Sequence, residues 1–151
     1  ISGNRAKDLR QRWQRECLDL NPGVVSILIG INDTWRRYDS GDPTPAETYE
    51  AHYRAILQTT QDVLHAQIII LEPFSLPVPE DRATWRVDLD PKIAVARKLA
   101  REFDATFVPL DGLFAAAAVH REMDFWLPDG VHPSPAGHAL IAQAWLRAAG
   151  A

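Results

Sequence analysis

The sequence predicts an α/β fold in three layers, with one parallel sheet between two layers of helices. Short apolar runs rich in β-branched residues occur at 24–30, 67–73 and 106–111, and such runs are typical of strands buried on both faces. Segments with an apolar residue at every third or fourth position lie between them, which indicates amphipathic helices. Strands that alternate with helices form a parallel sheet through right-handed crossovers.

The first half of the chain begins with a predicted helix over residues 5–20, which "NPG" ends before the strand at 24–30. Residues 36–45, "RRYDSGDPTP", are predicted to form a loop because Gly, Pro and Asp dominate them. Thr44 and Glu47 have the spacing of a capping box, with a proline at the first helical position, so a second helix is expected there.

The second half continues with the strand at 67–73 and a long loop over residues 74–89. A helix is expected to start at Asp90-Pro91, followed by the strand at 106–111 and a short helix over 112–120. A turn at "DGVH" then precedes a last helix, which we expect a serine to cap and a proline to open.

The composition and charge of the chain limit the classes of function that it can have. Residues 1–151 fit a single domain, with 46% apolar residues and a net charge of −4. The scattered Lys and Arg residues disfavour nucleic acid as the main partner, and no apolar run approaches the ~20 residues of a membrane span. The single cysteine allows no internal disulfide, which slightly favours the cytoplasm. A P-loop and a GxGxxG motif are both missing, which disfavours a nucleotide binder.

Asp129-Gly130-Val131-His132 combines a carboxylate and an imidazole in one tight turn. An Asp at this spacing can accept the Nδ1–H of the imidazole, which leaves Nε2 free to act as a general base. The alternative is an Asx-turn with a solvated histidine. The other four histidines are dispersed and form no ligand set, so no metal or cofactor is expected.

Two further residues offer hydrogen-bond donors. Asn32 directly follows a buried strand, and its side-chain amide is a neutral donor suited to an oxyanion. Gly3, in "ISGN", offers a backbone N–H with no side chain in the way. Considered separately, Asn32 could simply end a strand and Gly3 could be an ordinary loop glycine.

Taken together, "ISGN", "GIND" and "DGVHP" resemble the motifs of the SGNH (GDSL-type) hydrolase family over essentially the whole chain. The resemblance implies a flavodoxin-like sheet and a serine esterase, of lipase/acylhydrolase or carbohydrate-esterase type. By that resemblance Gly3 and Asn32 would be oxyanion donors, and His132 and Asp129 would be the base and its orienting carboxylate. The substrate would be a small ester, with an acylated carbohydrate as one option.

The nucleophile that the family requires is missing from these residues. In the family it lies in a Gly-Asp-Ser motif after the first strand, upstream of the "ISG" block, and no Gly-Asp-Ser occurs here. We therefore expect the chain to lack its first strand, its nucleophile and a further strand, and to be inactive alone. The alternative is a catalytically inactive relative or binding module.

Two more expectations concern the surroundings of the site. The strand at 24–30 would expose an apolar edge, so we expect a missing segment, another chain or a rearranged N-terminus to cover it. Trp35 and Arg36 follow the "GIND" block and could border the substrate pocket, where an aromatic side chain would suit a sugar. The alternative is an exposed loop with a packed tryptophan. Residues 72–85, "EPFSLPVPEDRATW", could likewise form a rim that shapes specificity.

Overall fold

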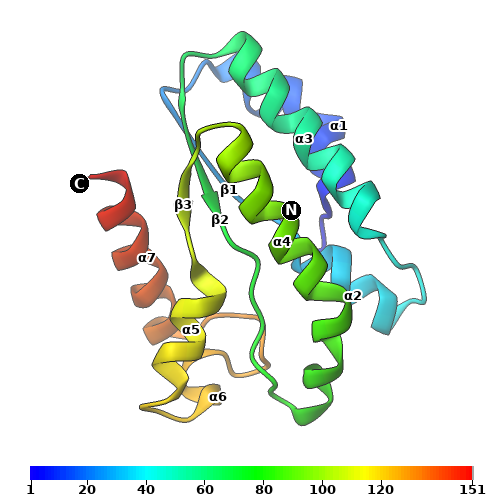
Figure 1. Cartoon of the computed structure of the whole chain (residues 1–151), viewed down its shortest axis with the longest axis vertical. Helices are drawn as coiled ribbons and strands as arrows, with labels where there is room; N and C mark the ends of the chain where they lie inside the picture. The colour runs from blue at the N-terminus through cyan, green and yellow to red at the C-terminus, as the bar shows by residue number, and fades with distance from the viewer. Residues whose placement is uncertain (151) are drawn as a thin grey trace.

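Three parallel strands form the sheet at the centre of the computed structural model, which describes residues 1–150 (Figure 1). β1 (Val24–Leu28) pairs with β2 (Gln67–Leu71), and β2 pairs with β3 (Thr106–Val108). The register places Ile70 of β2 opposite Ile27 of β1 and Phe107 of β3. The chain passes through helices between successive strands, so the predicted parallel α/β architecture is confirmed.

Helices α1 (Ala6–Glu16), α3 (Ala46–Val63) and α4 (Arg86–Glu102) cover one face of the sheet (Figure 1). A short 3₁₀ turn, η1 (Leu18–Leu20), follows α1. Alternate strand residues such as Ile27 and Ile70 point into this layer because side chains alternate along a strand.

The opposite face carries α5 (Leu110–Ala118) and α7 (Pro135–Ala149), which pack on the other set of strand residues, including Ile69 and Val108. One turn of helix, α6 (Met123–Trp126), joins them and was not predicted. Ser134 accepts the Gly137 N–H at 3.1 Å and so caps α7, as the sequence indicated. The two cores on either side of the sheet make the fold a three-layer sandwich.

β1 is covered on one face only. Val25 and Ile27 are buried, whereas Val24 and Leu28 on the other face remain 47% and 46% exposed. The prediction of burial on both faces is therefore wrong for β1. Within residues 1–150 no strand pairs with its outer edge, and the N-terminal segment forms no strand there.

The largest difference from the sequence prediction lies after β1, where an unpredicted helix, α2 (Ile31–Asp39), follows the strand and takes the first four residues of the predicted 36–45 loop. Gly30, at φ +133, turns the chain from strand straight into helix, and a Cβ there would meet Tyr49 and Pro73 at 3.0 and 3.2 Å. Thr44 does not cap α3: its hydroxyl accepts a hydrogen bond from Arg5 at 3.3 Å instead.

The helix expected to start at Asp90 begins earlier. A 3₁₀ segment, η2 (Glu80–Trp85), runs directly into α4 at Arg86, and Pro91 lies inside that helix. Pro91 is exposed, so water can solvate the backbone acceptor that its missing N–H leaves without a partner. None of the helices in the described part of the chain is long and apolar enough to cross a membrane.

Candidate active site

A cavity of about 400 Å³ opens beyond the carboxyl ends of the strands, where ligands bind in open parallel sheets. Gly3, Asn32 and His132 all line it, although they come from the N-terminal segment, the start of α2 and the turn before α7. Leu28 and Phe74 contribute apolar surface to the same wall. The three sequence motifs therefore meet at one place in the fold.

Asp129 and His132 form a hydrogen-bonded pair at the rim of this cavity. Oδ2 of Asp129 lies 2.7 Å from Nδ1 of His132. Its Oδ1 accepts the backbone N–H groups of Val131 at 3.0 Å and of His132 at 2.7 Å. Burial alone would raise the pKa of Asp129, but these hydrogen bonds hold it below its ordinary value. The carboxylate thus stays ionised and orients an imidazole whose side chain is 71% exposed.

The loop after β2 packs against this turn and holds it by hydrogen bonds. Gly130 has φ +79, and a Cβ at this position would overlap the carbonyl oxygens of Leu76 and Val78. The Gly130 carbonyl accepts the Leu76 N–H at 2.9 Å and the Ser75 hydroxyl at 3.0 Å. No local pattern indicated this contact of Ser75, because its partner lies 55 residues away in the chain.

Asn32 lies in the first turn of α2, with its side chain directed at the N-terminal segment. Its Nδ2 donates one hydrogen bond to the Asn4 carbonyl at 2.9 Å. A primary amide has two N–H donors, so one remains for a ligand in the cavity. Gly3 has φ +78, and a Cβ there would come within 3.0 Å of the Arg36 guanidinium. Gly3 therefore suits both the backbone angle and the narrow space.

Trp35 and Arg36 occupy different places although they are neighbours in the sequence. The Trp35 ring lies 5.7 Å from the His132 ring and 5.3 Å from that of Trp85. The Arg82 guanidinium lies 4.7 Å from the Trp35 ring centroid and 3.9 Å from that of Trp85. Arg36 instead pairs with Asp39. We call Trp35, Trp85 and Arg82 the aromatic wall.

Arg82 also connects the aromatic wall to the Asp–His turn. Its Nε donates to the backbone carbonyl of Asp129 at 3.3 Å. The sequence placed Arg82 and Trp85 in the 72–85 segment expected to form a rim, but it did not indicate their contacts with Trp35 or with the 129–132 turn. The 3₁₀ segment η2 brings both side chains to Trp35, whose ring lies beside that of His132.

Within the described residues, no serine hydroxyl hydrogen-bonds to His132. Ser2 lines the cavity, whereas the hydroxyls of the other four serines have partners elsewhere. Those four are Ser26, Ser40, Ser75 and Ser134. Nor do residues 1–150 hold a cluster of three or more His, Cys, Asp or Glu side chains able to bind a metal ion.

Comparison with known proteins gives a consistent family. The profile of the GDSL-like Lipase/Acylhydrolase family matches residues 1–140. An acetylxylan esterase of Geobacillus stearothermophilus is 34% identical over 156 residues, which cover 99% of this chain and 69% of that enzyme.

Solved structures agree with the sequence comparison. A protein described as a GDSL-like lipase from Parabacteroides merdae has a TM-score of 0.94 at 40% identity, covering 99% of this chain and 70% of its own. The acetylxylan esterase structure has a TM-score of 0.86 at 33% identity, covering 98% and 68%. Two further structures of that esterase are of catalytic mutants, one with a histidine and one with a serine replaced by alanine.

The family profile spans nearly the whole chain, and the structural matches extend over both layers of helices. The parallel sheet and the convergence of "ISGN", "GIND" and "DGVH" on one cavity are consistent with this result. This chain belongs to the GDSL-like lipase/acylhydrolase family of carboxylic ester hydrolases.

Proposed function

We propose that this chain supplies the base, the orienting carboxylate and two oxyanion donors of a serine ester hydrolase. The observation that carries the proposal is the meeting of His132 with Asn32 and Gly3 around one cavity, with Asp129 bonded behind the imidazole. A base and neutral N–H donors that face one space can deprotonate a hydroxyl and stabilise the anion its attack creates.

In the proposed reaction, Nε2 of His132 takes the proton from a serine hydroxyl as its oxygen attacks the ester carbonyl. The tetrahedral oxyanion accepts hydrogen bonds from the Gly3 N–H and from the second N–H of the Asn32 amide. When the intermediate collapses, the protonated His132 gives its proton to the departing alcohol. Water, deprotonated by the same imidazole, then hydrolyses the acyl-enzyme. Asp129 holds the imidazole and stabilises its charged form throughout.

The serine itself is proposed to come from outside these 151 residues, on a strand added to the sheet. The outer edge of β1 is open within residues 1–150, and one face of β1 exposes Val24 and Leu28. A parallel strand on that edge would bring its carboxyl end beside Gly3 and Asn32. It would also cover apolar surface that is a liability on an exposed strand.

The proposed substrate is an acetyl ester of a carbohydrate. Acetylxylan esterases are among the relatives of this chain, and the aromatic wall presents the Trp35 ring next to His132. A sugar ring can pack on an indole face while its ester reaches the imidazole. Arg36, which pairs with Asp39, is proposed to border the site beside Gly3 and not to contact the sugar.

Hydrolysis of p-nitrophenyl acetate tests the proposal in two proteins. One is the 151-residue chain, and the other joins it to a preceding strand–helix–strand segment that contains Gly-Asp-Ser, taken from upstream coding sequence or from the acetylxylan esterase. We expect activity with an acyl-enzyme burst only in the longer protein. In that protein Asn32→Ala should lower kcat by about 10²–10³, and His132→Gln should abolish turnover. His120→Gln, a change of an exposed histidine away from the cavity, serves as the matched control.

Other outcomes contradict specific parts of the proposal. Equal activity in both proteins would show that one of the five internal serines is the nucleophile, and Ser2→Ala would test the one at the cavity. Inactivity of both folded proteins toward acetyl esters would favour a non-catalytic binding module. Full activity of Asn32→Ala would refute its assignment as an oxyanion donor.

A further inference from the structure

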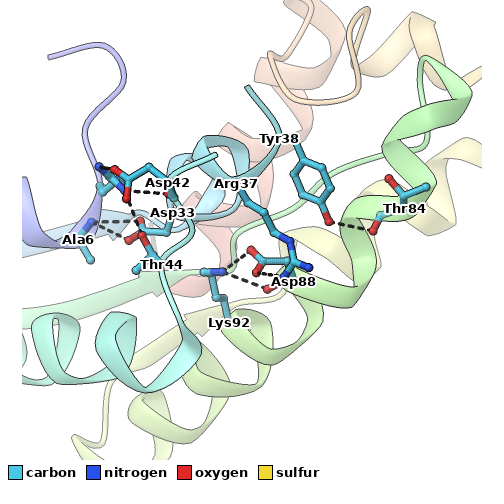
Figure 2. Close-up of polar contacts among 10 residues, drawn as sticks. Ala6, Asp33, Arg37, Tyr38, Asp42, Thr44, Thr84, Asp88 and Lys92 are labelled. Atoms are coloured by element: carbon cyan, nitrogen blue, oxygen red, sulfur yellow. Dashed lines mark hydrogen bonds and ion pairs between the residues drawn. The ribbon is translucent and has the colours of Figure 1, made fainter. Parts of the chain in front are cut away.

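A buried carboxylate lies directly behind the proposed oxyanion donors and has no part in the mechanism above. Asp33 follows Asn32 in α2 and is 0% exposed. Its Oδ2 accepts the backbone N–H of Ala6 at 3.1 Å, and its Oδ1 lies 3.4 Å from the same nitrogen. Figure 2 shows this contact at the start of α1, with Asp33 pointing toward Ala6.

The environment does not favour an ionised group at this position. Burial raises the pKa of Asp33 to about 6, although the Ala6 N–H and the charges of Lys92 and Arg5 act in the opposite direction. Lys92 forms its own ion pair with Asp88 at 2.5 Å (Figure 2). Asp33 is therefore held mainly by a backbone N–H, and an apolar side chain would be easier to bury at this place.

The position of Asp33 suggests what its carboxylate does. The Asn32 amide donates to the Asn4 carbonyl at 2.9 Å, and two residues later the Ala6 N–H donates to Asp33. Adjacent residues of α2 thus hold the N-terminal segment by two hydrogen bonds of opposite direction. Gly3 directly precedes this clamped segment. Without the Asp33 acceptor, only the Asn32 hydrogen bond would connect residues 4–6 with the start of α2, and the Ala6 N–H would be buried without a partner.

Arg5 also attaches the N-terminal segment to the rest of the fold, through residues that follow α2. Its guanidinium donates to Asp42 at 2.6 Å and to Thr44 at 3.3 Å, both in the loop beyond α2. Asp42 is exposed, and an exposed ion pair fixes geometry weakly. The buried contact between Ala6 and Asp33 is therefore the stronger constraint on where Gly3 lies.

We propose that Asp33 is a positioning residue of the esterase site: by accepting the Ala6 N–H, its carboxylate holds Gly3 and Asn32 at the separation that one oxyanion requires. This inference rests on the proposed function. It implies that Asp33 acts on the transition state through Gly3 and Asn32 without touching the substrate.

Kinetics of the active, longer protein provide the first test. Asp33→Ala removes the acceptor, so kcat should fall by at least about tenfold while KM stays within about twofold. The effect of deleting an oxyanion donor, about 10²–10³, is its upper limit. Asp33→Asn retains an oxygen acceptor and should keep kcat within about threefold. Asp88→Asn, a change of another buried carboxylate, should lower stability but leave kcat and KM unchanged.

An unchanged kcat in folded Asp33→Ala would overturn the proposal. So would equal losses in the Asp88 and Asp33 variants, because general destabilisation would then explain both. If Asp33→Ala does not fold, a second measurement, made on the parent protein and on Asp33→Asn, decides.

That second measurement needs no esterase activity. Amide resonances of Gly3 and Ala6 and the side-chain amide of Asn32 are followed by NMR from pH 4 to 8 in a His132→Gln background, which removes the imidazole at the site. The other ionisable groups that face Asp33 are Arg5, Lys92 and the phenol of Tyr49. A carboxylate accepts a stronger hydrogen bond than a neutral acid does, so all three resonances should shift together near pH 6, and should not in Asp33→Asn.

Flat resonances in the parent protein would overturn the connection between Asp33 and the two donors, even in an active enzyme. Shifts that persist in Asp33→Asn would assign the titration to another group and have the same consequence. A coupled titration in a longer protein that lacks esterase activity would instead refute the proposed function.

Discussion

Replacement of Asp33 by Asn should change how the stability of the fold depends on pH. The pKa of this carboxyl rises from 3.8 in an exposed aspartate to about 6 in the folded chain. Each pKa unit corresponds to about 1.4 kcal/mol, so ionisation of Asp33 destabilises the folded state by about 3 kcal/mol. Between these two pKa values the folded state binds more protons than the unfolded state, and the free energy of unfolding therefore falls as pH rises. The loss begins near pH 3, where an exposed aspartate starts to ionise, and is complete by about pH 7.

Urea denaturation at a series of pH values measures this effect directly. The difference in unfolding free energy between Asp33→Asn and the parent chain should shift in favour of the variant by about 2 kcal/mol between pH 4 and 7. A constant offset from the new amide group does not affect this slope, because asparagine does not titrate. Parallel pH profiles for the two proteins would refute the argument that burial raises the pKa of Asp33.

Three further changes test other parts of the structure. Gly130→Ala should lower the unfolding free energy by more than about 2 kcal/mol, because φ is +79 and the new Cβ overlaps two carbonyl oxygens. Thermal melting measures this loss. The control is Gly112→Ala, in α5 with open space around it, which should be neutral or stabilising. Lys92→Met should destabilise the chain by about 3 kcal/mol in urea, since it leaves the Asp88 carboxylate without its cation at 2.5 Å, and a Lys92→Met/Asp88→Leu double variant should recover much of that loss. In the active protein, Trp35→Ala should lower kcat/KM more for acetylated xylo-oligosaccharides than for p-nitrophenyl acetate. The difference should be up to about tenfold, because ring packing contributes about 0.5–1.5 kcal/mol. Equal losses on both substrates would show that the aromatic wall does not bind the sugar.

The strands and most of the helices could be predicted because their signals are local. Apolar β-branched runs mark β1, β2 and β3, and three- and four-residue spacing marks α1, α3 and α7. The ends of the elements were less accurate, because pairing and packing set them. The run at 24–30 continues for two residues beyond Leu28, where β1 ends. Pro91 looked like a helix start, but packing of α4 extends the helix back to Arg86.

The residues of the candidate site and their convergence could be predicted from the sequence, but the contacts that hold them in place could not. Gly3, Asn32 and His132 were identified through their motifs, and the structure brings them to one cavity. The segment of Ser75 and Arg82 was expected at the rim, but their contacts with the 129–132 turn were not predicted, because these contacts cross about 50 residues of chain and depend on how the 74–85 segment folds. Long-range contacts of this kind leave no periodic trace in the sequence.

The helical state of residues 31–39 explains why neighbours in the sequence serve such different purposes. Successive side chains of an α-helix point about 100° apart, so four consecutive residues face four directions from one turn. Asn32 faces the cavity, Asp33 the buried Ala6 N–H, Thr34 the interior and Trp35 the His132 ring. A loop could present the same residues, but it would not hold the Asn32 amide rigidly enough for its proposed role as an oxyanion donor, because preorganised donors require a fixed backbone. Gly30 is the residue that makes this possible: its φ of +133 lets the helix start directly at the end of β1, and the strand thereby sets the position of the side chains that follow.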